Sequence, residues 1–159
     1  MTVRNIIKNE KGFTLIELLV VIGILAILLA ITLIAINPAR QFGQANDTKR
    51  RSDANAILNA IGQYTASNTG QLPDEIKNMA ATGSAELDDA TFPNLCNDLV
   101  PTYLPALPVD PGQNNQAGIS SCSGAWGDTH YKIAKDANNR ITISAPDAYA
   151  GSTAIQVTR

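Results

Sequence analysis

The sequence predicts an α+β fold in which a long N-terminal hydrophobic α-helix is packed on a small head containing an antiparallel β-sheet. Three observations support this prediction. Residues 13–36 form an apolar run that contains a single charged residue, Glu17. Apolar side chains then recur at helical spacing in residues 54–64, and two strand-like segments, 131–134 and 140–144, lie near the C-terminus.

The apolar run 13–36 predicts a membrane span. As a helix it would be about 36 Å long, which is enough to cross the hydrocarbon core of a bilayer. A carboxylate inside such a segment is costly, so Glu17 is expected to have a function, the alternative being a side chain that only snorkels to the headgroups. A cleaved signal peptide fits less well, because the run is longer than a signal core and no A-x-A site follows it.

The charges are distributed unevenly along the chain. Residues 1–12 carry a net charge of +2 within an overall charge of −2, so the remainder is acidic. An acidic head argues against nucleic acid as an obligate partner, because phosphate binding requires a basic surface. Basic residues flank both ends of the apolar run, so the positive-inside rule does not decide the orientation of the span.

Residues 37–67 are predicted to continue the helix as an amphipathic segment. Asn37-Pro38 indicates that the helix either bends at Pro38 or stops and restarts there. The apolar stripe of this segment consists of Ala54, Ile57, Leu58, Ile61 and Tyr64. We expect this stripe to pack on the sheet. The polar positions, expected to be exposed, include Lys49, Arg50, Arg51 and Asp53.

Residues 68–159 are predicted to form the globular head. Six prolines recur between residues 71 and 111, so we expect mostly irregular backbone over 71–130, with short helical turns around 89–100. Segments 131–134 and 140–144 flank a turn-rich stretch, which predicts a β-hairpin, and residues 152–158 are expected to add a third strand.

The two cysteines, Cys96 and Cys122, are not in a CxxC motif, and the chain has one histidine, His130. These are too few ligands for a zinc site of the usual kind. Beyond a membrane span, in an oxidising compartment, a Cys96–Cys122 disulfide is the favoured interpretation, and two buried free thiols are the alternative.

The sequence contains no motif for catalysis. It has neither a G-x-S-x-G elbow nor a glycine loop for phosphate, so we expect no enzyme activity, no catalytic residues and no cofactor. The acids Glu86, Asp88 and Asp89 are interpreted as a solvated surface, with a divalent-cation site as the alternative.

The start of the apolar run carries a specific resemblance. It reads Lys11-Gly12-Phe13-Thr14-Leu15-Ile16-Glu17. This stretch closely resembles the processing motif of type IV pilins and type II secretion pseudopilins. The resemblance implies a leader, residues 1–12, that stays in the cytoplasm, cleavage between Gly12 and Phe13 by a prepilin peptidase, and N-methylation of Phe13.

The same resemblance implies how the chain assembles. Glu17 would pair with the Phe13 ammonium of a neighbouring subunit and so set the axial register, which suits a carboxylate in a low-dielectric bundle. The implied partners are further copies of the chain in a helical filament, the membrane before assembly, and an inner-membrane assembly platform with its ATPase. The implied location is first the cytoplasmic membrane, as a single-pass precursor, and then an extracellular or periplasmic filament.

A second resemblance lies in the head. It covers Tyr103-Leu104-Pro105-Ala106-Leu107-Pro108-Val109-Asp110-Pro111. This stretch is similar to the Tyr-Leu…Pro-x-Asp-Pro segment of major pseudopilins and related pilins, and its prolines suit an ordered loop laid over a sheet. A generic proline-rich connector is the alternative. Some pseudopilins bind calcium in the loop that follows, but here residues 112–127 contain no acid, so no metal ligand is assigned.

These observations favour a structural subunit of a type IV pilus-like filament. A pseudopilin of a type II secretion system is the alternative within the same class: the 103–111 segment favours it, whereas the expected disulfide and the acid-free loop favour a pilin. From other classes, a membrane-anchored enzyme would not depend on Glu17, and a secreted binding protein would start beyond residue 36.

Overall fold

The computed structural model describes residues 12–113, 117–149 and 154–159. The chain divides into two compact units, residues 1–40 and 41–159. The first contains the apolar helix α1, and the second contains the head with most of helix α2. Each unit is described by itself.

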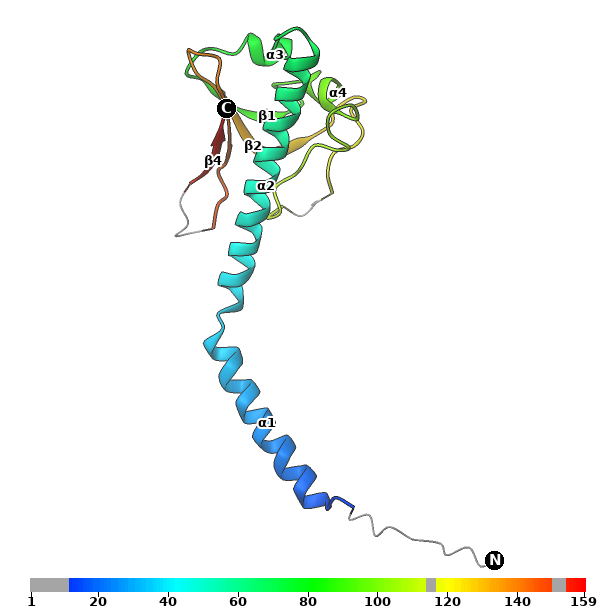
Figure 1. The fold of residues 1–159 in the computed structure, drawn as a ribbon, viewed down its shortest axis with the longest axis vertical. Coiled ribbons are helices and arrows are strands. Elements are labelled where there is room, and N and C mark those ends of the chain that lie inside the picture. The colour runs from blue at the N-terminus through cyan, green and yellow to red at the C-terminus, as the bar shows by residue number, and fades with distance from the viewer. Residues whose placement is uncertain (1–11, 114–116, 150–153) are drawn as a thin grey trace, which may run out of the picture. The chain divides into compact units, whose positions relative to one another are not determined.

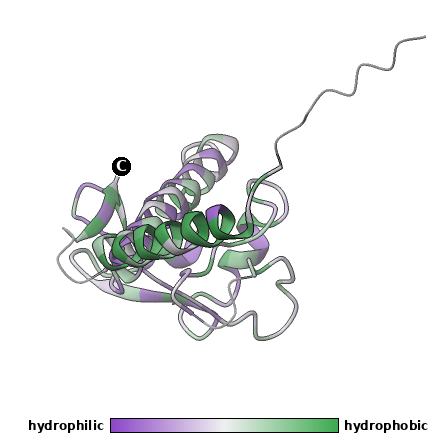
Figure 2. Cartoon of the chain, turned by 90° about the horizontal axis from the view of Figure 1, so that it is seen from below, coloured by the Kyte–Doolittle hydropathy of each residue, from purple (hydrophilic) through white to green (hydrophobic). Residues whose placement is uncertain are grey.

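Helix α1 spans Leu15–Ala35 and is built almost entirely from large aliphatic residues. Figure 2 shows it hydrophobic along nearly its whole length, whereas the other long helix is mixed. The last hydrogen bond at its end runs from the Ile36 N–H to the Thr32 carbonyl. Pro38 lies two residues further on and restricts Asn37 to extended backbone, which explains why the helix ends here.

Helix α2 spans Pro38–Ser67, so the helix stops and restarts at the Asn37-Pro38 step. Proline suits the first position of a helix because its missing N–H would have no partner there. The Asn37 side chain accepts a hydrogen bond from the Arg40 N–H at 3.2 Å, which satisfies one of the free donors of the first turn.

Four antiparallel strands form the sheet of the head, in the order β1-β2-β3-β4 (Figure 1). Their bounds are β1 Ser84–Asp88, β2 Asp128–Lys135, β3 Ile141–Ala145 and β4 Ile155–Thr158. Strands β2 and β3 form the expected hairpin, in register with Ile133 opposite Ile143. Strand β4 adds the expected third strand, within the described residues of the segment 152–158.

The prediction for residues 71–130 was incomplete. Helix α4, Leu95–Leu99, lies where short helical turns were expected. Strand β1 and the one-turn helix α3, Asp74–Lys77, were instead expected as irregular backbone. Strand β1 was missed because its five residues alternate only weakly and include two acids, so its position depends on pairing with β2 rather than on its own composition.

One hydrophobic core joins α2 to the sheet. Alternate residues of β2 and β3 point inward, among them Tyr131, Ile133 and Ile143. They belong to the same buried cluster as the α2 residues Ala54, Ile57, Leu58 and Ile61. The predicted packing of the α2 stripe on the sheet is therefore confirmed, as is the α+β class of the fold.

Candidate functional site

The start of α1 is fixed by a capping box between Thr14 and Glu17. The Glu17 N–H donates to the Thr14 hydroxyl oxygen at 3.3 Å, and the Thr14 N–H donates to Glu17 Oε2 at 2.8 Å. The Thr14 hydroxyl donates to the same carboxylate oxygen at 2.7 Å. These bonds satisfy donors that a helix start would leave unpaired. The Thr14-x-x-Glu17 spacing carries this signal in the sequence, although Thr14 was not assigned a role there.

The capping box also fixes the position of the Glu17 carboxylate. Both Thr14 bonds go to Oε2, and no hydrogen bond from the part of the chain that the structure describes reaches Oε1. The two hydrogen bonds from Thr14 partly replace the hydrogen bonds to water that the carboxylate loses in a membrane. Oε1 can still accept a hydrogen bond from a further donor.

Gly12 and Phe13 precede α1 in exposed, non-helical backbone. The peptide bond between them is therefore not protected by helical hydrogen bonds. Phe13 and Glu17 together line two shallow hollows of about 380 and 230 Å³, with Ile16, Leu18, Val20 and Val21 as the other lining residues. Lys11 and the rest of the leader lie outside the described residues.

No residue of α1 is buried. Among the described residues, α1 is the one helix long and apolar enough to cross a membrane, by length and composition. An apolar surface of this extent is far larger than a soluble monomer normally exposes. Its length and composition suit insertion into a membrane, and the same surface can later be covered by other helices.

In the head, a buried ion pair joins α2 to the proline-rich loop. Arg50 Nε and Nη2 donate to the two carboxylate oxygens of Asp110 at 2.7 and 2.8 Å. Arg50 is 4% exposed and Asp110 is fully buried, so the expectation that Arg50 lies on an exposed face was wrong. The partner that explains this burial is sixty residues away in the sequence, and helical periodicity cannot reveal it.

The proline-rich loop is ordered by these contacts. The Asp110 N–H donates to the Thr129 carbonyl at 3.0 Å, and Leu107 pairs with Ile119 in an isolated β-bridge. Asp110 Oδ1 also accepts a hydrogen bond from the Gly112 N–H at 2.7 Å. The Asp-Pro segment is thus held between α2 and the start of β2, which agrees with the expectation of an ordered loop.

Cys96 and Cys122 are joined in a disulfide with a Cα–Cα distance of 5.4 Å. Cys96 lies on the buried side of α4, and Cys122 lies in the long loop before β2. The bond therefore ties this loop to the core.

Two of the acidic residues expected at the surface, Glu86 and Asp88, have ordinary partners. Glu86 pairs with Lys132 across the sheet at 2.8 Å, and Asp88 accepts a hydrogen bond from the Thr91 N–H. Within the described ranges, no three metal-ligating side chains cluster together.

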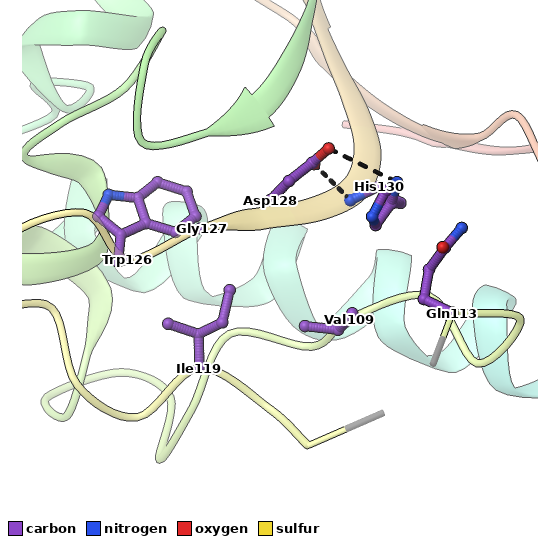
Figure 3. Close-up of a pocket in the computed structure, with 7 residues that line it drawn as sticks. All are labelled: Val109, Gln113, Ile119, Trp126, Gly127, Asp128 and His130. Carbon is purple, nitrogen blue, oxygen red and sulfur yellow. Dashed lines mark hydrogen bonds and ion pairs between the residues drawn. The ribbon is translucent and has the colours of Figure 1, made fainter. Parts of the chain in front are cut away.

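The head also contains a hollow of about 300 Å³ beside the start of β2 (Figure 3). It is lined by Val109, Gln113, Ile119, Trp126, Gly127, Asp128 and His130. Asp128 Oδ1 accepts a hydrogen bond from the His130 N–H at 2.7 Å, and the imidazole Nδ1 lies 3.5 Å from Oδ2. Among the described residues that line this hollow, none carries a hydroxyl or thiol that could serve the Asp128–His130 pair as a nucleophile.

Comparisons with known proteins bear on the N-terminal segment. Residues 7–33 match the family model described as the prokaryotic N-terminal methylation motif. The comparisons with curated proteins and with solved structures gave no match. The matched segment includes Gly12, Phe13, Thr14 and Glu17 and most of α1. The chain therefore carries the prepilin-type motif of type IV pilins and pseudopilins, which supports a pilin-like or pseudopilin-like role.

Proposed function

We propose that this protein is a structural subunit, a pilin, of a type IV pilus-like filament. The observation that carries the proposal is the prepilin-type motif at the start of a helix that has no buried residue and is apolar apart from Glu17 and Thr32. The precursor is cleaved between Gly12 and Phe13 by a prepilin peptidase, and the new amino group of Phe13 is methylated. The exposed backbone at this bond supports access by the peptidase.

In the filament, α1 of each subunit packs against α1 of its neighbours. Burial of apolar surface contributes about 25 cal/mol per Å² relative to water, and less when the helix leaves lipid, because lipid is itself apolar. Assembly therefore needs an external energy source, which fits an inner-membrane platform and its ATPase. The filament ends outside the cytoplasmic membrane, in the periplasm or at the cell surface.

Glu17 sets the register between neighbouring subunits. Cleavage creates an ammonium at Phe13, and a carboxylate in a low-dielectric bundle is stabilised by an opposite charge at close range. Both Thr14 donors bind Oε2. Oε1 can therefore accept a hydrogen bond from the Phe13 ammonium of a second subunit while the capping box stays intact.

The Glu17 proposal is tested with Glu17→Gln, which keeps the shape of the side chain and removes its charge. We expect normal cleavage and strongly reduced filament yield, measured by immunoblot for processing and by electron microscopy of sheared filaments. Glu17→Asp, which keeps the charge on a shorter side chain, is the matched control and should retain more assembly than Glu17→Gln. Normal filament yield from Glu17→Gln would contradict the register role.

A pseudopilin of a type II secretion system is the second candidate. The segment 103–111 favours it, because this segment is similar to the Tyr-Leu…Pro-x-Asp-Pro segment of major pseudopilins. In this chain the Asp-Pro step is held by the buried Arg50–Asp110 pair. Deletion of the gene separates the two. A pilin mutant loses surface filaments and keeps protein secretion, whereas a pseudopilin mutant accumulates secreted enzymes in the periplasm.

A further inference from the structure

Arg51 is, among the residues that the structure describes in the head unit, the basic side chain without a partner. The other lysines and arginines of this unit each make a hydrogen bond or an ion pair through the side chain: Lys49, Arg50, Lys77, Lys132, Lys135, Arg140 and Arg159. Arg51 lies exposed on α2. Asp47, one turn earlier on the helix, is buried and binds Arg50 at 2.8 Å. Arg51 therefore presents an unmatched positive charge at the surface of the head.

The hollow beside the start of β2 offers an acceptor for such a charge (Figure 3). Asp128 Oδ1 accepts the His130 N–H, whereas no hydrogen bond from the described chain reaches Oδ2. The imidazole Nδ1 lies 3.5 Å from Oδ2, which is longer than an ordinary hydrogen bond. Much of the remaining lining is apolar, with Val109, Ile119 and Trp126. A long basic side chain can place its methylene stem on this apolar lining and its charged end at Asp128.

The charges around this hollow are mostly acidic in the described chain. Asp88 lies directly opposite Asp128 in the β1–β2 register, and like charges at such positions repel each other. Asp147 accepts a hydrogen bond at 3.1 Å from the glutamine of the lining. Lys132, on the same strand as Asp128, is already paired with Glu86 at 2.8 Å. A further cation at Asp128 would therefore lower the electrostatic free energy of this surface.

The sheet separates Arg51 from Asp128 within one head. Helix α2 packs on the inner face of the sheet, in the buried cluster that also contains Tyr131 and Ile133. Asp128 alternates with the buried Thr129 along β2 and so lies on the outer face. Complementary patches on different sides of one chain meet when copies pack head to tail. A contact of this kind repeats along an open helical filament when the rotation does not close into a ring.

From this charge complementarity we propose that, in the filament, Arg51 of one copy enters the hollow of a second copy and pairs with Asp128. This contact rests on the proposed filament function and joins the heads of neighbouring subunits. A second copy is the occupant because the same chain supplies both halves of the pair. One ion pair at a surface is weak, so the contact orients neighbouring heads, while the α1 helices supply most of the cohesion.

Cross-linking of assembled filaments tests this contact. Arg51→Cys and Asp128→Cys are introduced into one chain, and sheared filaments are treated with a short bismaleimide. The native cysteines are joined in a disulfide, so the linker reacts only with the introduced thiols. The matched control combines Gly62→Cys with Asp128→Cys. Gly62 is exposed on the same side of α2 about 16 Å beyond Arg51, and a Cβ there meets no neighbouring atom.

We expect a ladder of covalently joined subunits from Arg51→Cys with Asp128→Cys. The control should give few or no cross-links, because a short linker does not span the additional distance along α2. Equal ladders from the two pairs would overturn the proposal, and so would Arg51→Cys, Asp128→Cys filaments that do not cross-link. A cysteine linked to a protein other than this chain would overturn the choice of a second copy as the occupant.

Charge substitutions test the same contact without added cysteines, and they apply equally if Asp128→Cys prevents assembly. Arg51→Glu places two carboxylates against each other, so we expect it to lower the filament yield by about tenfold or more. Arg51→Lys keeps the charge and should retain most of the yield. Arg51→Glu combined with Asp128→Lys restores opposite charges and should recover assembly. An unchanged yield from Arg51→Glu would refute the contact.

The unmodified chain separates this proposal from the function on which it rests. If the unmodified chain forms no filament, the proposed function itself fails. If it forms filaments and Arg51→Glu forms them equally well, the filament function stands and only the contact between heads fails.

Discussion

Arg50 links helix α2 to the proline-rich loop of the head. Its guanidinium bridges Asp47 on the same helix and Asp110 in the proline-rich loop. These carboxylates, Asp110 foremost, raise the pKa of Arg50 above its already high usual value, so the guanidinium stays charged at every accessible pH. A buried ion pair contributes little net stability over an apolar core, but the loss of one partner leaves an uncompensated charge.

Substitution of Arg50 should therefore be severe. We expect Arg50→Ala to lower the free energy of unfolding by about 3–5 kcal/mol, because Asp110 then stays buried without a cation. Urea unfolding of the full chain in detergent measures this. Arg51→Ala, at the exposed next position, should change stability by no more than about 0.5 kcal/mol. Equal losses in both variants would show that the buried pair does not hold the loop.

Asp98 makes the stability of the head depend on pH. Partial burial, together with the charges of Glu75 and Asp74, raises the pKa of Asp98 above the usual aspartate value. The folded state thus holds this proton more tightly than the unfolded state, so the contribution of Asp98 to stability falls as pH rises from the ordinary pKa of aspartate through the raised one.

The corresponding variant is Asp98→Asn. At neutral pH we expect it to stabilise the head, by less than about 1 kcal/mol because the group is mostly solvated. Below the ordinary pKa of aspartate the gain should vanish, since the native carboxyl is then protonated too. Thermal unfolding of both proteins across this pH range measures the difference. A gain that persists at low pH would show that the effect is not electrostatic.

At the scale of elements, the disulfide anchors the longest irregular part of the head. It joins α4 to the loop before β2 across a sequence separation of 26 residues. Cross-linking a loop of this length lowers the conformational entropy of the unfolded chain. This stabilises the folded state by about 3 kcal/mol. We expect Cys96→Ala combined with Cys122→Ser to lower the free energy of unfolding by roughly this amount, measured by urea unfolding. An unchanged midpoint would mean that loop packing alone orders this region.

Elements with strong periodicity could be predicted from the sequence, whereas elements defined by long-range pairing could not. The span, the α2 stripe and the β2–β3 hairpin each carry their own pattern of apolar residues. Strand β1 exists because it pairs with β2, and no local pattern of its five residues indicates this. The restart at Pro38 was one of two open alternatives, since proline permits a kink as well as a break.

The same distinction holds for the candidate site. Gly12, Phe13 and Glu17 were predicted through a local motif, and Thr14 could have been predicted through its capping-box spacing. Arg50 could not, because its burial depends on a partner that the fold brings from the proline-rich loop.

At the scale of the whole molecule, the two units are built for different surroundings. The head unit buries a conventional core and is closed by a disulfide, whereas α1 buries nothing in the single chain. A helix of this kind needs lipid or other helices around it. The proposed function uses both in turn, with lipid before assembly and neighbouring subunits afterwards.

In the proposed function, the leader is removed so that Phe13 becomes the first residue of the working protein. Intact mass and N-terminal sequence of the protein recovered from its own cells test this most directly. We expect a mature chain that begins at N-methylated Phe13. An intact Met1, or a chain that starts near Ala39, would contradict it.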